Sequence, residues 1–177
     1  PENIIYNAVA VGRYFIHNTK HTDGELLAAA ERYINRKYGA AGNSIECIYT
    51  AQGYTKCNIA VIDDSHIITE DEGIFRAVSE KTDIKVLIIA PKQVKLNEFP
   101  HGFIGGASGR VGNEILFNGD ITAHSDYAKI RNFIEECGLA VKYFDYPLTD
   151  IGSIIEEKYN EEACDYSGVH TASRLPA

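Results

Sequence analysis

The sequence predicts an α/β fold of repeated units, each made of a β-hairpin, a helix and a further strand. Apolar strand-like segments recur after an asparagine, a two-residue turn follows each segment at the same offset, and a helix-like segment comes next. The repeats start at Asn7, Asn58 and Asn113, so the intervals are 51 (58 − 7) and 55 (113 − 58) residues. Self-similarity at such a period is typical of folds in which small units pack on one another.

Each unit begins with two short strands around a tight turn. The first strands are predicted in NAVAV, NIAVI and NEILF, and the second strands in YFIH, HIIT and DITAH. The turns are expected at Gly12–Arg13, Asp63–Asp64 and Asn118–Gly119. Asn-Gly is the strongest short-range hairpin signal, so the third turn carries the clearest pattern.

A helix follows each hairpin and starts with residues that accept hydrogen bonds from the free N–H groups of a first helical turn. These starts are Thr22/Asp23, Glu70/Asp71 and Ser125/Asp126. The third helix is expected to end at Gly138. Its apolar residues lie on one face at helical spacing, at Ile130, Phe133, Ile134 and Cys137. Each helix leads to a further strand, in SIECIY, IKVLII and AVKYFDY.

The units are expected to cover about 6–50, 57–92 and 112–146, and the segment LTDIGSII from Leu148 is expected to begin another. Residues 1–156 therefore form one repeat domain, followed by an aperiodic tail over 157–177. Units packed around a common axis share a core, and the loops that enter their first strands meet near that axis.

Composition narrows the class of protein. The chain has 177 residues, of which 45% are apolar and 24% are charged, as in an ordinary globular protein. Its net charge of -8 argues against nucleic acid as a partner and is compatible with a small cationic or polar molecule. No signal peptide or membrane-spanning run is found, so we expect a cytoplasmic protein without a membrane partner.

The cysteines give no sign of a metal site. None of Cys47, Cys57, Cys137 and Cys164 forms a C-x-x-C pair or lies near a histidine at zinc-ligand spacing. The sequence therefore predicts neither a metal nor a cofactor, and each thiol is expected to be a small buried side chain.

The segment GFIGGASGRVGNEILFNGD, residues 102–120, is rich in glycine. It matches neither nucleotide-binding glycine pattern and leads into a strand rather than a helix, which disfavours a phosphate cradle. Two interpretations stay open: a crossover where backbone approaches a neighbouring unit, or a pocket wall of backbone N–H groups. Since AQGYTKCN and YPLTDIG also enter first strands, the loops should converge, which makes substrate-binding candidates of five residues: Asn58, Gly105, Gly106, Asn113 and Ser153.

Several segments carry a resemblance to a known superfamily: NAVAVGRYFIHN, QGYTKCNIAVIDDSHIITEDEGI, GFIGGASG, LFNGDITAH and LTDIGSII. They resemble the guanidino-group-modifying enzymes, or penteins, and most closely an uncharacterised bacterial family assigned to that α/β-propeller fold. The resemblance covers about Tyr6 to Ile155. That family normally carries a further unit before this point, so the resemblance implies a ring that lacks an N-terminal unit, which a second chain or a missing segment would complete.

The resemblance also implies a chemistry in which a Cys thiolate attacks a guanidinium carbon, a His transfers protons and carboxylates hold the cationic nitrogens. The superfamily's Cys lies in a Gly-Ser-x-x-Cys-like setting, where GSIIE places Glu156. The candidates are then Cys57 as nucleophile, Asp150 as carboxylate and His124 as proton carrier. Their ordinary alternatives are a packed thiol, a turn-capping aspartate and a capping or solvated histidine.

Two functions stay open. The first is a hydrolase or amidinotransferase that modifies a guanidine or amide with a thiol nucleophile. The second is a catalytically degenerate pentein that serves as a binding or assembly module, because the usual cysteine is replaced. Fold alone does not choose between them.

Overall fold

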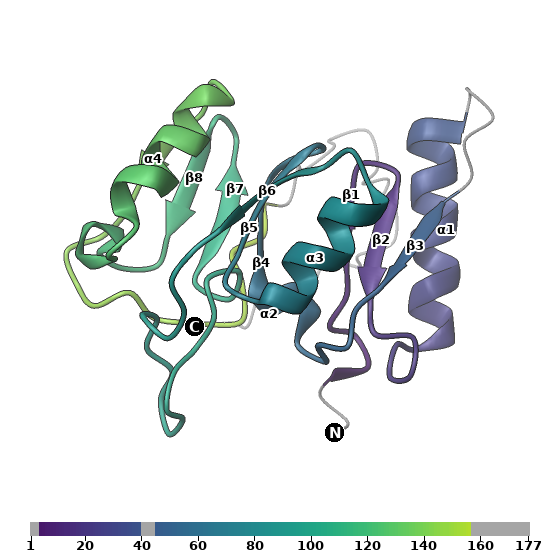
Figure 1. Cartoon of the computed structure of the whole chain (residues 1–177), viewed down its shortest axis with the longest axis horizontal. Helices are drawn as coiled ribbons and strands as arrows, with labels where there is room; N and C mark the ends of the chain where they lie inside the picture. The colour runs from purple at the N-terminus through teal and green to yellow at the C-terminus, as the bar shows by residue number, and fades with distance from the viewer. Residues whose placement is uncertain (1–3, 40–44, 157–177) are drawn as a thin grey trace, which may run out of the picture.

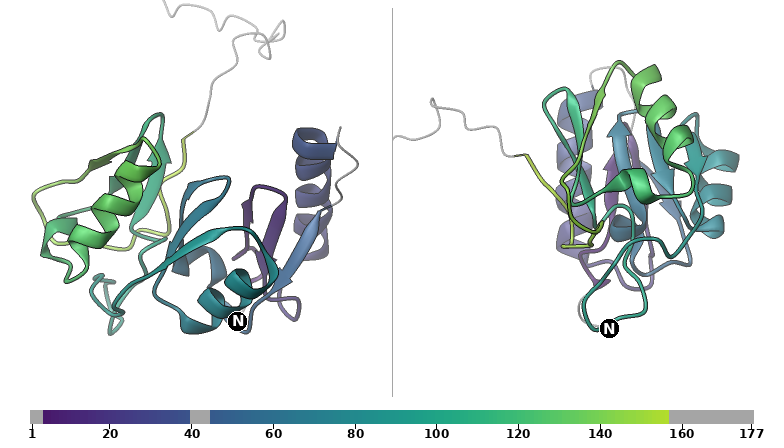
Figure 2. Two further views of the ribbon diagram at one scale, coloured as in Figure 1. Left: turned by 45° about the horizontal axis from the view of Figure 1, so that its top comes forward. Right: turned by 90° about the vertical axis from the view of Figure 1, so that its left-hand side faces the viewer.

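Three ββαβ units lie side by side in chain order in the computed structural model, which describes residues 4–39 and 45–156 (Figure 1). Each unit has a three-stranded sheet in which the first two strands are antiparallel and the third is parallel to the second. The repeated α/β fold that the sequence predicts is confirmed. Figure 2 shows the units from two further sides.

The first two units follow the predicted order closely. The first contains β1 (Val9–Val11), β2 (Tyr14–His17), α1 (Gly24–Tyr38) and β3 (Glu46–Tyr49). The second contains β4 (Ile59–Asp63), β5 (His66–Thr69), α3 (Glu72–Lys81) and β6 (Lys85–Ile88), and the short helix α2 (Thr55–Asn58) precedes it. Its hairpin turn lies at Asp64–Ser65, one residue later than predicted, because the strand register is irregular between Val61 and Asp63.

The third unit corrects the predicted hairpin. It contains β7 (Ser108–Val111), β8 (Glu114–Phe117), the 3-10 helix η3 (Ile121–Ala123), α4 (Tyr127–Glu136) and β9 (Ala140–Lys142). The turn is Gly112–Asn113, where Gly112 adopts a φ of 56°, and the predicted Asn118–Gly119 turn is wrong. Glycine is needed at position 119 for another reason, since its φ is 120° and a Cβ there would crowd the Pro147 carbonyl.

The helices begin where the sequence predicts. Asp23 caps α1 by accepting from Glu25 N and Leu26 N, and Asp71 caps α3 by accepting from Ile74 N. Asp126 precedes α4, but its carboxylate accepts from Ala90 N instead, at 2.7 Å. Over the described residues, no helix combines the length and the apolar character needed to cross a membrane.

The segment from Leu148 does not form the expected strand. Its Thr149 makes only a single bridge, to Lys95, and Pro147 just before it makes another, to Asp120. The segment then runs beside the third unit, where Ile154 N donates to Ser108 O at 3.2 Å. The tail over 157–177, including Cys164, lies outside the described residues.

Strand β4 lies at the centre of the molecule and contacts both β1 and β7. Ile59 packs in the apolar cluster shared with the first unit, whereas Ala60 and Ile62 pack in the cluster shared with the third. Successive strand residues point to opposite faces, so a strand covered on both faces needs an unbroken apolar run such as IAVI. This packing fixes the loop that enters β4 between the other two units.

Candidate active site

The three loops that the sequence predicts to converge do meet. They include residues 51–58, 102–107 and 146–152, and Gly106 joins them. Its N–H donates to Cys57 O at 3.0 Å, and its carbonyl accepts from Ile151 N at 3.1 Å. Backbone hydrogen bonds therefore tie the entry to β4, the glycine-rich loop and the final segment into one cluster.

Glycine is required in this loop because neighbouring atoms, backbone at Gly105 and a carboxylate at Gly106, come too close for a side chain. A Cβ on Gly105 would overlap the Ile59 carbonyl, and a Cβ on Gly106 would overlap the Asp150 carboxylate. The interpretation of a close approach between units is thus confirmed. The Gly106 N–H is bonded to Cys57, so that group is not free for a ligand.

Cys57 is half-buried in α2, and the side chain of Asn7 clamps it. Asn7 Oδ1 accepts from Lys56 N at 2.6 Å and from Cys57 N at 3.2 Å, while Nδ2 donates to Cys57 Sγ at 3.2 Å. Burial raises the pKa of the Cys57 thiol, and the opposing effects of Asn7 and Lys56 do not outweigh it. The free protein therefore holds a neutral thiol rather than an activated thiolate.

Asp150 is buried, with 8% of its surface exposed. Oδ2 accepts from Phe103 N at 3.0 Å and Oδ1 accepts from Gly152 N at 2.9 Å. The turn-capping role that the sequence left open is therefore present. The same carboxylate also contributes to the raised pKa of Cys57, so its charge acts on the thiol.

Lys56 and Ser153 close the other side of the cluster. Lys56 Nζ donates to Ser153 Oγ at 2.8 Å, and that hydroxyl donates to Gly105 O at 2.9 Å. Burial lowers the pKa of Lys56 and outweighs the opposing influence of the Asp150 charge and of a Cys57 thiolate. The ammonium group is thus engaged with a neutral hydroxyl rather than with a carboxylate.

Glu70 is the residue that sequence reasoning missed as a site residue. It lies between β5 and the cap of α3 and is 8% exposed. Burial, together with the charges of Asp150 and Asp71, raises the pKa of Glu70 to about 7. Its buried Oε2 accepts no hydrogen bond from any residue that the structure describes.

Comparison of equivalent positions in the three units could have identified Glu70. With the third hairpin aligned correctly, the residue that directly follows the second strand is polar in every unit: Asn18, Glu70 and Asn118. The correspondence was not recognised because the third hairpin turn was predicted at Asn118–Gly119 instead of Gly112–Asn113.

His124 is buried but takes part in a different arrangement. Its Nδ1 accepts from Asp126 N at 3.0 Å, and burial lowers its pKa. It lines a surface pocket of about 640 Å³ together with Lys95 and Asp120. The residues lining that pocket include neither Cys57 nor Glu70, so the structure does not unite His124 with the predicted nucleophile.

The remaining predicted residues have local contacts. Asn58 is buried and donates from Nδ2 to Tyr54 O at 3.1 Å, which closes α2. Asn113 is exposed in the β7–β8 turn, not at a strand entry, so the reasoning that made it a candidate was wrong. Glu156, which stands in place of the superfamily's cysteine, is also exposed.

Comparison with solved structures finds dimethylarginine dimethylaminohydrolases. The enzyme from Pseudomonas aeruginosa, as a mutant complexed with citrulline, is 15% identical with a TM-score of 0.46, over 79% of this chain and 48% of that chain. An adduct of a variant with S-methyl-L-thiocitrulline is 16% identical with a TM-score of 0.47, over 78% and 47% of the respective chains. The present chain thus spans about half the length of these structures.

Among the curated proteins, none matches the chain. A family model, described as a family of unknown function (DUF6873), matches residues 1–155. The chain belongs to this family.

Proposed function

We propose that the chain binds a small cation with several N–H donors, a guanidinium or an amidinium group, at Glu70 and Asp150. The observation that carries the proposal is the Glu70 carboxyl, which is buried and has an oxygen without a partner among the described residues. A buried carboxylate is costly unless a cation and hydrogen-bond donors satisfy it. A bound guanidinium would supply both.

The surrounding charges favour such a ligand. The negative charges of Asp150 and Asp71 both help to raise the pKa of Glu70, so the surroundings of Glu70 are acidic. Asp71 already accepts from Ile74 N at 2.8 Å and from Gln52 Nε2 at 3.1 Å, which leaves Glu70 as the acceptor with spare capacity. The planar, forked donors of a guanidinium match two carboxylate oxygens, and this geometry favours it over a single ammonium group.

A second candidate function is thiol chemistry at Cys57, the enzyme function inferred from the sequence. It is favoured by the hydrogen bond from Asn7 to Cys57 Sγ and by the nearby Lys56 charge, both of which act to lower the pKa of the thiol. In this reaction Sγ forms a bond to the guanidinium carbon, the C–N bond to the departing amine breaks, and that amine takes up the thiol proton. Cation binding ranks first because the Cys57 pKa is raised, so a nucleophilic thiolate would have to be generated by the bound substrate.

Binding can be tested by calorimetric titration with agmatine, which carries a guanidinium, and with cadaverine, which carries ammonium groups only. The wild-type protein is compared with Glu70→Gln and with Glu72→Gln, an exposed glutamate on α3. Loss of one charge-assisted hydrogen-bonding group costs about 1.5–3 kcal/mol, so we expect Glu70→Gln to bind agmatine roughly 10- to 100-fold more weakly. Equal affinity of the two variants, or no saturable agmatine binding by the wild type, would overturn the proposal.

The thiol function has a separate test. Chloroacetamidine resembles a guanidinium and alkylates thiols, so we expect it to label Cys57 faster in the folded protein than in urea, with Cys57→Ser as the control. Labelling of Cys57 that is no faster when folded contradicts thiol chemistry and leaves cation binding standing.

A further inference from the structure

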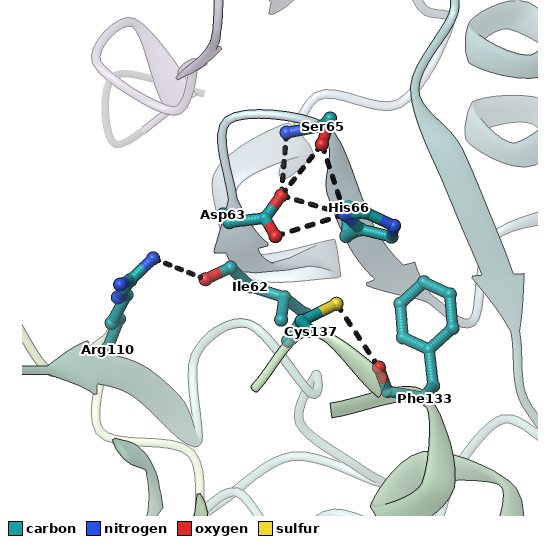
Figure 3. Close-up of polar contacts among 7 residues, drawn as sticks. All are labelled: Ile62, Asp63, Ser65, His66, Arg110, Phe133 and Cys137. Carbon is teal, nitrogen blue, oxygen red and sulfur yellow. Dashed lines mark hydrogen bonds and ion pairs between the residues drawn. The ribbon is translucent and has the colours of Figure 1, made fainter. Parts of the chain in front are cut away.

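A second cluster of ligand-type side chains lies at the junction of the second and third units. Asp63 ends β4, His66 begins β5, and Cys137 is the C-cap residue of α4 (Figure 3). One ligand atom from each of the three residues lies within 4.8 Å of the other two, and all three side chains are half-buried. None of them belongs to the candidate active site.

Hydrogen bonds fix the positions of these side chains. His66 Nδ1 lies 2.9 Å from Asp63 Oδ1 and 3.0 Å from Oδ2, and Ser65 N donates to the same carboxylate at 2.7 Å (Figure 3). Cys137 Sγ donates to Phe133 O at 3.3 Å. The His66 ring packs edge-on against the Phe133 ring, with centroids 5.6 Å apart.

The junction around the cluster is also held together from the third sheet. Arg110 Nη1, from β7, donates to Ile62 O at 3.2 Å, directly beside Asp63 (Figure 3). Strand β4 of the second unit is therefore held against β7 of the third unit by a contact that involves none of the three candidate ligands. A site supported in this way is preorganised, because the ligands do not have to be assembled by the ion alone.

We propose that Asp63, His66 and Cys137 bind a zinc ion, which joins the second unit to the third. Carboxylate oxygen, imidazole nitrogen and thiolate sulfur are the ligand types of Zn²⁺, at bond lengths of about 2.0–2.3 Å. Tetrahedral coordination at these lengths places ligand atoms roughly 3.5 Å apart. The separations in the structure, from 2.9 Å to at most 4.8 Å, lie on both sides of this spacing, so small side-chain movements suffice.

The proton balance of binding is simple. The Cys137 thiol loses its proton to solvent and forms the Zn–S bond. The proton that His66 Nδ1 shares with Asp63 moves to Nε2, which frees Nδ1 and a carboxylate oxygen for the ion. Three protein ligands leave a fourth tetrahedral position for water.

This site could not be predicted from the sequence, because it depends on the fold. Asp63 and His66 are close in the chain, but Cys137 comes from the next unit. The expectation that no metal binds rested on spacing along the sequence, and the packing of α4 against the hairpin turn supplies the third ligand instead.

The test uses the full chain, freed of metal with a chelator, and Co²⁺ as a spectroscopic probe for Zn²⁺. We expect one Co²⁺ per chain with a thiolate-to-cobalt charge-transfer band, abolished in Cys137→Ser and retained in the matched control Cys47→Ser, an exposed thiol on β3. His66→Ala should weaken binding at least tenfold, and Zn²⁺ should raise the thermal midpoint of the wild type but not of Cys137→Ser.

A second measurement needs no variant. Zn²⁺ should slow the alkylation of Cys137 by iodoacetamide, mapped by mass spectrometry, without slowing that of Cys47. No charge-transfer band in the wild type, a band that persists in a folded Cys137→Ser variant, or a Cys137 alkylation rate unaffected by Zn²⁺ would overturn the proposal. Any of these results would mean that the cluster is only a hydrogen-bonded contact between units.

Discussion

Replacing Glu70 by glutamine should make the stability of the protein depend less on pH. Glutamine has the shape of a protonated glutamate but stays neutral at every pH, so it mimics the form that burial favours. The wild-type protein must instead carry a buried charge above the pKa of Glu70. The variant should therefore gain stability relative to the wild type as the pH rises.

The magnitude follows from the two protonation equilibria. The pKa of Glu70 rises from 4.5 to about 7 on folding. Since the folded pKa is the higher one, the protonated carboxyl stabilises the fold fully below pH 4.5, and this contribution is lost as the pH rises through 7. At about 1.4 kcal/mol per pKa unit the whole effect is about 3 kcal/mol, of which about 2 kcal/mol falls between roughly pH 5.5 and pH 8.

The assay is urea unfolding of the wild type and Glu70→Gln at about pH 5.5 and about pH 8, without ligand. The chain has no tryptophan, so far-ultraviolet circular dichroism is the suitable signal. The free-energy difference between variant and wild type should grow by about 2 kcal/mol from the lower to the higher pH. Glu72→Gln, on the exposed face of α3, should show no such growth.

A difference between Glu70→Gln and the wild type that is the same at both pH values would refute the reasoning. It would mean that Glu70 is ionised in the folded protein across this range. The same growth in Glu72→Gln would equally refute it, since the effect would then not belong to the buried carboxyl. Because both comparisons are made against the same wild type, other titrating groups cancel.

Three further substitutions and one control are measured by urea unfolding, and one of them also by agmatine binding. Asn7→Ala removes the acceptor for two backbone N–H groups at the start of α2 and should cost about 1–3 kcal/mol; a loss below about 0.5 kcal/mol would contradict the clamp. Gly106→Ala places a Cβ on the Asp150 carboxylate and should lower the free energy of unfolding by more than about 2 kcal/mol. Its control is Gly24→Ala, in open space on α1, which should be neutral or stabilise the fold by up to about 1 kcal/mol. Asn113→Ala should leave both stability and agmatine binding unchanged, and weaker binding would restore Asn113 as a site residue.

Most of the fold could be predicted because local chemistry and tertiary packing agree in the first two units. Asp23 and Asp71 cap their helices at the positions that the sequence predicts. The unbroken apolar run of β4 agrees with its burial on both faces. The third hairpin could not be predicted in the same way. Gly112–Asn113 and Asn118–Gly119 both have turn chemistry, and only the pairing of β7 with β8 decides which of them turns the chain.

The candidate site was predicted less completely. Converging loops brought Cys57 and Asp150 into one cluster, but the pattern along the sequence did not show which side chains contact one another there. Asn7 reaches Cys57 from the start of the first unit, and Lys56 reaches Ser153 from the entry to β4. Such contacts depend on the angle between units, and no local sequence pattern encodes that angle. The raised pKa of Glu70 likewise depends on burial, which arises only in the assembled fold.

The glycine-rich loop and the acidic site are physically coupled, and this coupling can be measured. Because Gly106 lacks a Cβ, the Asp150 carboxylate can lie against the loop, and from there its charge adds to the raised pKa of Glu70. A methyl group at Gly106 should displace Asp150 and so lower the pKa of Glu70. In the double variant of Gly106→Ala with Glu70→Gln, the two changes should therefore be non-additive at about pH 8 and closer to additive at about pH 5.5. Additivity at both pH values would show that the loop serves unit packing alone and that Glu70 owes its pKa to burial without Asp150.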